Sequence, residues 1–257
     1  MKTVIKIGTS TLAHTGGRLN IRRTEELCKV ISDLKNSGNE IIIVTSGAIG
    51  MGTGKLGLKE RPADMATKQA AAAVGQCELM YVYDKLFSEY NHTVAQILVT
   101  ASDFNHDDRH RNFSVTLSRL LDLGVIPIIN ENDTIATEEI GIGDNDTLAA
   151  MVATSAGADL LILLSDVEGL YSADPRKDPN AKLIEEIRVI DDSVMKLGGG
   201  SGSSLGTGGM RTKLSAAKIC TEAGCDMIIA DGSDPSVLYT IADGGKAGTR
   251  FYGKKTL

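Results

Sequence analysis

The stretch LLILLSD (residues 160–166) places five consecutive aliphatic residues directly before a serine and an aspartate. An apolar run of this length without alternation suits a strand that is buried on both faces, as in a parallel sheet. Similar runs occur at five other places: VIKI (4–7), IIIV (41–44), VAQILV (94–99), VIPII (125–129) and MIIA (227–230). Together these runs predict a mainly parallel sheet.

Helical patterns lie between the predicted strands, over residues 22–37, 66–90 and 112–123. Gly38 and Gly124 follow the first and third of them, where a glycine suits a helix C-cap. Strands that alternate with helices predict an α/β fold with helices on both faces of the sheet. We find no internal repeat and no clear domain boundary. The chain can still be divided into a substrate half up to about residue 150 and a nucleotide half from about 151 to 257.

Polar residues follow four of the predicted strands: GTS (8–10), TSGA (45–48), NEND (130–133) and SD (165–166). In open α/β sheets, ligands bind beyond the carboxyl ends of the strands. The sequence therefore predicts that the functional site lies along this edge.

Composition narrows the class of protein. The chain has 257 residues with a net charge of −6, aromatic residues make up 4%, and tryptophan is absent. These values argue against binding to a nucleic-acid backbone or stacking on bases, so we expect no nucleic-acid partner. No apolar run approaches the roughly 20 residues that span a bilayer, so we expect a cytoplasmic protein without a membrane partner. Four cysteines (Cys28, Cys77, Cys220 and Cys225) show no metal or disulfide spacing, and we interpret them as buried thiols.

The segment TGGMRTK (residues 207–213) is a glycine-rich turn that leads into a helical pattern. Backbone N–H groups at a helix start attract phosphate oxygens, and Lys213 adds a movable positive charge. The segment is not a Walker A loop, because Thr212 stands where that motif requires glycine. Taken alone, the segment is equally compatible with a flexible loop beside a surface lysine.

Lys6 lies inside an apolar strand, where an unpaired lysine is rare. Its ammonium at the top of the sheet can neutralise phosphoryl oxygens. For this residue taken alone, however, a lysine that extends into solvent is the preferred interpretation, and Lys6 gains weight only together with the other motifs. The segment GDND (143–146) opens a helical pattern, and capping is one reading of it. Together with NENDTI (130–135) it can instead hold the ammonium and carboxylate of an amino acid. Asp146 is our candidate for orienting Lys6 and Lys213.

Three further patterns are less decisive. TSGA ends a strand with a hydroxyl group and a glycine, and Ser165-Asp166 can line a nucleotide-base site. GTGKLG (52–57) matches a dinucleotide-binding pattern but does not follow a strand directly. His106 and His110 have metal-ligand spacing on a helix, yet we interpret their polar segment as solvated and expect no protein metal site.

Six motifs together resemble the amino acid kinase family: KIGTS (6–10), VTSGAI (44–49), INENDT (129–134), GDND, DxxGLYxADP (166–175) and GTGGMRTK (206–213). They cover almost the whole chain in one order. The resemblance implies a single three-layer α/β/α domain over residues 1–257. It also implies transfer of the ATP γ-phosphoryl group to the γ-carboxylate of L-glutamate, the first step toward proline, with Mg²⁺ carried by ATP. The open alternatives are aspartate, N-acetylglutamate, carbamate or UMP as substrate, or a non-catalytic amino-acid sensor.

The resemblance also implies roles for individual residues. The expected catalytic residues are Lys6, Lys213 and Asp146. The expected substrate-binding residues are Ser46, Gly47, Asn130, Asp133, Asp144 and Asn145. The expected ATP-binding residues are Lys6, Ser165, Asp166, Thr207, Gly208, Gly209, Met210, Arg211, Thr212 and Lys213. Bacterial members of the family with this activity often carry a C-terminal PUA domain, which we expect to be missing here. We further expect a homo-oligomer, dimer or tetramer, and proline as a possible feedback inhibitor.

Overall fold

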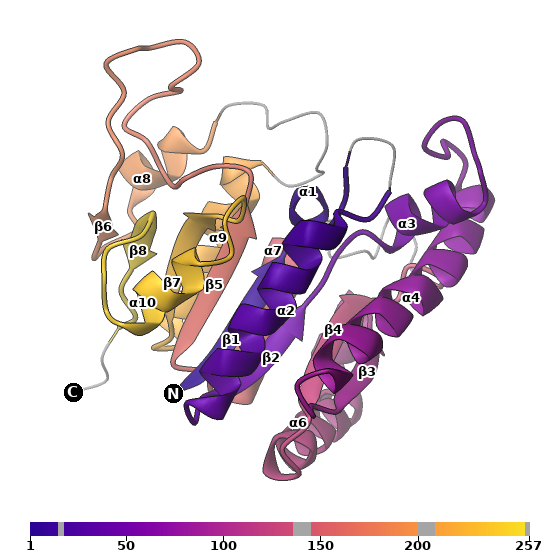
Figure 1. Ribbon diagram of the computed structural model, residues 1–257. Coiled ribbons are helices and arrows are strands. Elements are labelled where there is room, and N and C mark those ends of the chain that lie inside the picture. Colours follow the sequence, from indigo (N-terminus) through magenta and orange to yellow (C-terminus); the bar gives the residue numbers. More distant parts are fainter. Residues whose placement is uncertain (15–17, 136–144, 200–208, 255–257) are drawn as a thin grey trace.

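The computed structural model describes residues 1–14, 18–135, 145–199 and 209–254. Within this part of the chain, one eight-stranded sheet has the order β3-β4-β2-β1-β5-β7-β8-β6 (Figure 1). The strands are β1 (Lys2–Ile7), β2 (Glu40–Val44), β3 (Val94–Val99), β4 (Ile126–Glu131), β5 (Leu160–Ser165), β6 (Glu186–Ile187), β7 (Asp226–Asp231) and β8 (Thr249–Phe251). β7 and β8 pair antiparallel, and the other neighbouring pairs are parallel. The predicted mainly parallel sheet is confirmed.

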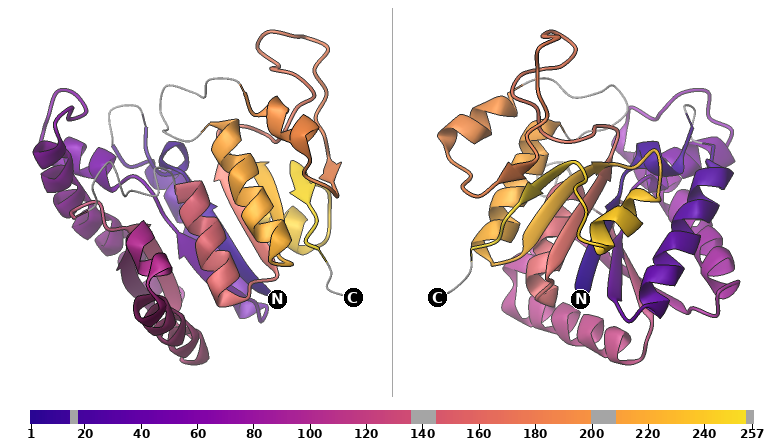
Figure 2. Two further views of the ribbon diagram at one scale, coloured as in Figure 1. Left: turned by 180° about the vertical axis from the view of Figure 1, so that it is seen from behind. Right: turned by 60° about the vertical axis from the view of Figure 1, so that its left-hand side comes forward.

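Helices cover both faces of the sheet, as Figures 1 and 2 show. One face carries α2 (Ile21–Asn36), α3 (Ala48–Lys55), α4 (Met65–Ser88) and α10 (Val237–Ala242). The other carries α6 (Asp107–Asp122), α7 (Asn145–Ala156), α8 (Asp192–Leu197) and α9 (Met210–Glu222). Two short helices, α1 (Thr9–Leu12) and α5 (Ala101–Asn105), follow the ends of β1 and β3. The three-layer α/β/α architecture is therefore confirmed.

Alternate residues of each central strand enter separate cores. Val4 of β1 packs in the core beneath α6, α7 and α9, whereas Ile5 and Ile7 pack in the core beneath α2, α4 and α10. β5 divides in the same way, with Leu161 and Leu163 on one side and its remaining aliphatic residues on the other. Because both faces are buried, the strand sequences show no polar alternation.

The helix boundaries largely follow the sequence signals. Gly38 (φ +92°) and Gly124 (φ +73°) have the left-handed backbone expected just beyond a helix end. One prediction was wrong, because α6 begins at Asp107 and not near residue 112. Asp107 and Asp108 lie in its first turn, where carboxylates favour the positive end of a helix. The polar segment that we interpreted as solvated is thus the exposed start of α6.

One of the four cysteines departs from the prediction. Cys28, Cys220 and Cys225 are buried, but Cys77 is exposed. Cys77 lies on α4, directly after Gln76. Gln76 is buried, whereas Cys77 points to the other side of the helix and is exposed. Burial of Cys77 was therefore wrongly predicted because its side of the helix faces solvent.

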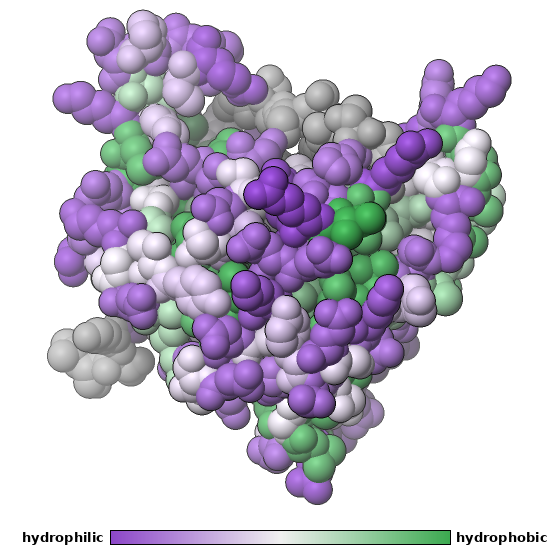
Figure 3. Space-filling view, viewed as in Figure 1, coloured by the Kyte–Doolittle hydropathy of each residue, from purple (hydrophilic) through white to green (hydrophobic). Residues whose placement is uncertain are grey.

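The surface shown in Figure 3 is mainly hydrophilic, with hydrophobic side chains gathered between α2 and α4. Among the helices of the described ranges, none combines the length and the apolar character needed to cross a membrane.

The strand order places a topological switch point at the middle of the sheet. The chain leaves β1 toward β2 on one side, and β5 lies directly against the other side of β1. The connections from β1 and from β5 therefore run in opposite directions. At such a switch point the loops separate and leave room for a ligand. Lys6 stands near the end of β1 and Ser165 at the end of β5, so both flank this point.

Candidate active site

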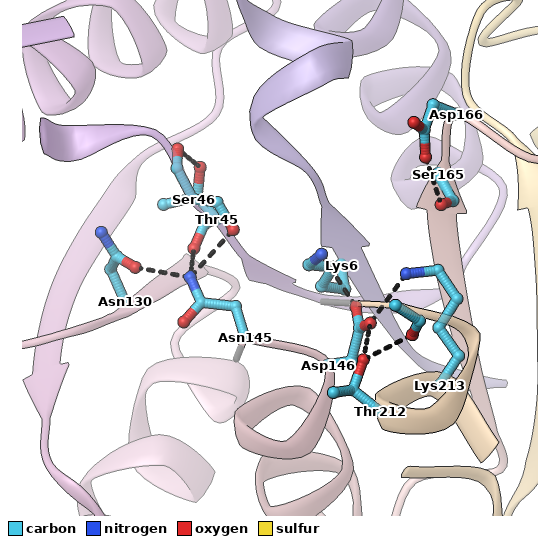
Figure 4. A network of polar contacts seen from close by, with 11 residues as sticks. Lys6, Thr45, Ser46, Asn130, Asn145, Asp146, Ser165, Asp166, Thr212 and Lys213 are labelled. Carbon is cyan, nitrogen blue, oxygen red and sulfur yellow. Dashed lines mark hydrogen bonds and ion pairs between the residues drawn. The ribbon is translucent and has the colours of Figure 1, made fainter. Parts of the chain in front are cut away.

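Two lysines from distant parts of the chain meet at one carboxylate (Figure 4). Lys6 Nζ lies 2.8 Å from Asp146 Oδ1, and Lys213 Nζ lies 2.8 Å from Asp146 Oδ2. The three residues come from β1, α7 and α9, and their exposed fractions are 8%, 0% and 6% for Lys6, Asp146 and Lys213. The arrangement predicted for Asp146, an anion between two lysines, is thus present.

The charges of this cluster determine the protonation of Asp146. Burial by itself raises the pKa of the Asp146 carboxyl, but the ammonium groups of Lys6 and Lys213 outweigh burial and hold that pKa well below its usual range. The carboxyl is therefore ionised at neutral pH. The two lysines and one carboxylate together carry one net positive charge. A second anion is therefore favoured beside them.

The N-terminus of α9 lies at the same cluster. Gly209 is the N-cap residue, and no side chain caps it. Thr212 Oγ1 donates to the Gly209 carbonyl oxygen at 2.7 Å and to Asp146 Oδ2 at 3.3 Å, which joins the first turn of α9 to Asp146. Met210 and Thr212 are half-buried, and Arg211 is exposed. Thr207 and Gly208 lie outside the described residues.

The amide of Asn145, the residue next to Asp146, joins two neighbouring strand ends. Its Nδ2 lies 2.6 Å from the Thr45 carbonyl oxygen, 2.9 Å from Ser46 Oγ and 3.0 Å from Asn130 Oδ1. Thr45 and Ser46 follow β2, while Asn130 lies on β4 (Figure 4). Predicted substrate-side residues from three segments are therefore brought together.

Two more predicted substrate residues border this group. Gly47 has φ +95° and is the N-cap of α3, so the chain turns sharply after Ser46. Asp133 is half-buried. Burial and the nearby Glu131 carboxylate raise the pKa of Asp133 to about 6, although Arg61 acts in the opposite direction. Asp144 lies outside the described residues.

Ser165 and Asp166 lie at the carboxyl end of β5, the strand that pairs with β1, which carries Lys6 (Figure 4). Ser165 Oγ donates to Asp166 Oδ1 at 3.2 Å. Ser165 is buried and Asp166 is exposed.

Residues that the sequence did not single out support the Asn145 group from behind. Asn130 Nδ2 donates to Gln76 Oε1 at 2.9 Å, and the hydroxyl groups of Thr45 and Tyr83 lie 3.0 Å apart. Gln76 and Tyr83 are seven positions apart on α4, which is two helical turns and one face. In the sequence, the feature that could have drawn attention to Gln76 is its position at the end of the alanine-rich run AAAAVGQ (70–76).

Comparison with known proteins identifies the family of this chain. Residues 1–231 match the model of the amino acid kinase family. The chain is 53% identical over 251 residues to "Glutamate 5-kinase" of Caldanaerobacter subterraneus subsp. tengcongensis, a match covering 98% of this chain and 68% of that protein. It is 48% identical to "Glutamate 5-kinase" of Clostridium perfringens, covering 99% of this chain and 96% of that protein.

A solved structure supports the fold independently. Carbamate kinase from Giardia lamblia bound to AMP-PNP superposes with a TM-score of 0.69 at 17% identity, covering 98% of each chain. At this identity the likeness concerns the fold alone. The sequence match over residues 1–231, the two relatives and the shared architecture lead to one conclusion: the chain belongs to the amino acid kinase family.

Proposed function

We propose that this protein transfers the γ-phosphoryl group of ATP to the γ-carboxylate of L-glutamate, giving γ-glutamyl phosphate and ADP. The reaction is the first step of proline biosynthesis, and the proposal places it in the cytoplasm. Relatives that are about half identical over nearly the whole chain are glutamate 5-kinases. In the site itself, the observation that supports the proposal most directly is the Lys6–Asp146–Lys213 cluster. Asp146 directly follows Asn145, whose amide binds the substrate-side residues.

The chemistry requires little proton transfer. A γ-carboxylate is ionised at neutral pH, so its oxygen can attack phosphorus without a general base. The new bond joins that oxygen to the γ-phosphorus, while the bond to the β,γ-bridging oxygen breaks and ADP leaves with the electron pair. The remaining task is to hold two anions in line and to offset their repulsion. A site with excess positive charge beside a polar substrate pocket meets that task.

Lys6 and Lys213 are the proposed catalytic cations, and Asp146 is the proposed anchor that aims them. The two Asp146 oxygens each hold one ammonium group, so the two lysines converge on one carboxylate. Such preorganisation lets the positive charge meet the charge that develops on the phosphoryl oxygens. The start of α9, from Gly209 through Met210, Arg211 and Thr212, is the proposed neighbour of the ATP phosphates. We propose that Thr207, Gly208, Ser165 and Asp166 complete the ATP side.

We propose that Mg²⁺ enters with ATP and offsets the charge of its phosphates. Within the described ranges, no three His, Cys, Asp or Glu side chains are grouped as metal ligands. In proteins, Mg²⁺ is commonly held by phosphate oxygens and water together with one or two carboxylates.

The amino-acid subsite is proposed at the Asn145 group. Ser46 and Asn145 present hydroxyl and amide groups, and Asp133 supplies a carboxylate for the substrate ammonium. Gly47, Asn130 and Asp144 are the proposed flanking residues. Residues 1–150 then form the substrate half and residues 151–257 the nucleotide half of one domain. Proline shares an α-carboxylate and an ammonium with glutamate, so we propose that it competes with glutamate at this subsite. We also propose that the protein is a homo-oligomer, either a dimer or a tetramer.

The test is to incubate the purified protein with ATP, Mg²⁺, L-glutamate and hydroxylamine. γ-Glutamyl hydroxamate and ADP should form in equal amounts, and omission of glutamate should stop both. Parallel reactions with aspartate, N-acetylglutamate, carbamate and UMP separate the alternatives. A folded preparation that binds glutamate but forms no product would favour an amino-acid sensor, and product from another acceptor alone would replace glutamate.

A further inference from the structure

Four side-chain amides form a directional chain that ends at the proposed substrate. Asn145 Nδ2 donates to Asn130 Oδ1 at 3.0 Å, and Asn130 Nδ2 donates to Gln76 Oε1 at 2.9 Å. Gln76 Nε2 then donates to Gln96 Oε1 at 3.1 Å. The nitrogens of Asn145, Asn130 and Gln76 each donate away from the active site, toward Gln96 on the edge strand β3. The three hydrogen bonds therefore have one common polarity.

This polarity determines what Asn145 offers to a ligand. Its nitrogen faces three acceptors, the Thr45 carbonyl oxygen, Ser46 Oγ and Asn130 Oδ1. The Oδ1 atom lies on the opposite side of the same amide (Figure 4). Ser46 Oγ accepts from Asn145, so its own proton remains to be donated. The pair thus presents one acceptor and one donor, which match an ammonium and a carboxylate.

A carboxamide can reverse its donor and acceptor by rotating through 180°, with almost no change in shape. If the Asn130 amide reversed, its nitrogen would face the nitrogen of Asn145, because the Thr45 carbonyl oxygen holds the Asn145 amide in its present orientation. The hydrogen bond between the two residues would then be lost. The Glu131 backbone N–H donates to Asn130 Oδ1 at 2.9 Å and holds one side of that amide. Gln76 Oε1 accepts from the other side.

Gln76 is well placed to hold the Asn130 amide in one orientation. Its exposed fraction is 7%, and it lies on the 24-residue helix α4. Its neighbour Gly75 lies so close to α3 that a Cβ atom there would be 1.8 Å from the Ala48 carbonyl oxygen. The backbone that carries Gln76 is therefore pressed against the helix that follows Ser46 and Gly47.

We infer that Gln76 is a positioning residue that holds the Asn130 amide in the orientation in which it accepts from Asn145, and that it thereby supports the selectivity for a substrate with an α-ammonium group. Gln76 acts through Asn130 and does not touch the substrate. The inference rests on the proposed function, because it concerns the same amino-acid subsite. It adds a determinant of substrate selectivity that lies on α4, behind the site.

The test compares binding of L-glutamate with that of glutarate, which lacks the ammonium group. Dissociation constants are measured by calorimetry with the full chain, and the readout is the ratio of Kd for glutarate to Kd for glutamate. Gln76→Met removes the acceptor at similar size, and this ratio should fall about tenfold. Glutamate KM should rise about as much, with ATP KM within about twofold. Gln76→Glu keeps an oxygen toward Asn130 and should restore most of the ratio.

Two further variants keep the test decisive. Cys77→Ser, at the exposed neighbouring position on α4, should leave the ratio unchanged. Gln96→Leu alters the exposed end of the chain, should fold, and should lower the ratio about twofold to threefold. The inference is overturned if folded Gln76→Met retains the wild-type ratio, if Gln76→Glu is as impaired as Gln76→Met, or if Gln96→Leu changes nothing. Wild-type protein that forms no hydroxamate would instead count against the proposed function.

Discussion

Asn145 and Asp146 are consecutive residues at the start of α7, and their side chains reach different halves of the active site. Asn145 contacts Thr45, Ser46 and Asn130, whereas Asp146 holds Lys6 and Lys213. Successive helix residues point about 100° apart, so one helical turn serves two neighbouring groups. In the proposed reaction this geometry keeps the acceptor carboxylate beside the phosphoryl group.

Asp146→Asn should weaken both stability and catalysis. The substitution leaves two buried ammonium groups without their carboxylate, a change that typically costs about 3–5 kcal/mol. We expect kcat to fall at least about a hundredfold, because the lysines lose their common anchor. Urea unfolding and the hydroxamate assay measure the two effects. Asp108→Asn, in an exposed ion pair with Arg111, is the control and should change neither by much. Wild-type kcat in Asp146→Asn would remove the anchoring role.

The fold was largely predictable because its strands are buried on both faces. The run at residues 160–164 is apolar throughout, since β5 lies in the middle of the sheet between β1 and β7. β6 and β8 were not predicted, because they have only two and three residues, and Glu186 and Arg250 break any apolar pattern. Such short strands exist because a neighbour pairs with them.

The sequence predicted which residues form the site better than it predicted which atoms contact one another. An acidic residue near two lysines was a reasonable prediction for Asp146, and both ion pairs are present. Gln76 could not be foreseen as a partner of Asn130, because helical periodicity reports which face is buried and not which atom lies opposite. Contacts across 54 positions of sequence depend on the packing of α4 against the sheet.

The same cluster should make stability depend on acidity. The pKa of Asp146 in the folded protein lies below that of an ordinary aspartate, about 3.9. The unfolded chain therefore binds the proton more tightly, and acid favours unfolding. The stabilisation is complete above the unfolded pKa and is lost as the pH falls through the folded pKa. Unfolding free energies between pH 5 and pH 2 should decline less steeply in Asp146→Asn than in the wild type. Equal slopes would contradict the lowered pKa.

Lys213→Ala should separate catalysis from glutamate binding. The ammonium group lies on the nucleotide side of Asp146, away from the Asn145 group. We expect kcat to fall about a hundredfold or more, while glutamate KM changes less than about threefold. Steady-state kinetics with both substrates varied provides the measurement. Lys218→Ala, on the same helix, is the matched control and should behave as the wild type. An unchanged kcat in Lys213→Ala would exclude the catalytic role.

Asp133 should make glutamate use pH-dependent. Burial and Glu131 raise the pKa of Asp133 to about 6, so the carboxyl gains a proton as the pH falls from 7 to 5. The protonated form has no negative charge for the substrate ammonium, and kcat/KM for glutamate should fall across this range. Asp133→Asn should have a lower value at pH 7 and a flatter profile. Titration of ATP is common to both proteins and cancels in their ratio. A ratio that does not vary with pH would separate Asp133 from ammonium binding.

Gly75→Ala should disturb the platform behind the substrate subsite. A Cβ atom at Gly75 would lie 1.8 Å from the Ala48 carbonyl oxygen and 2.5 Å from the Gly52 nitrogen, so α3 and α4 would have to separate. We expect a loss of at least about 2 kcal/mol in the free energy of unfolding. Gly50→Ala is the matched control on α3, because among the described residues its Cβ would meet Thr9 Cγ2 alone, at 3.8 Å. That change should be neutral or slightly stabilising, since alanine favours a helix by up to about 1 kcal/mol. Urea denaturation of both variants decides the matter, and equal stabilities would mean that α3 and α4 can separate at little cost.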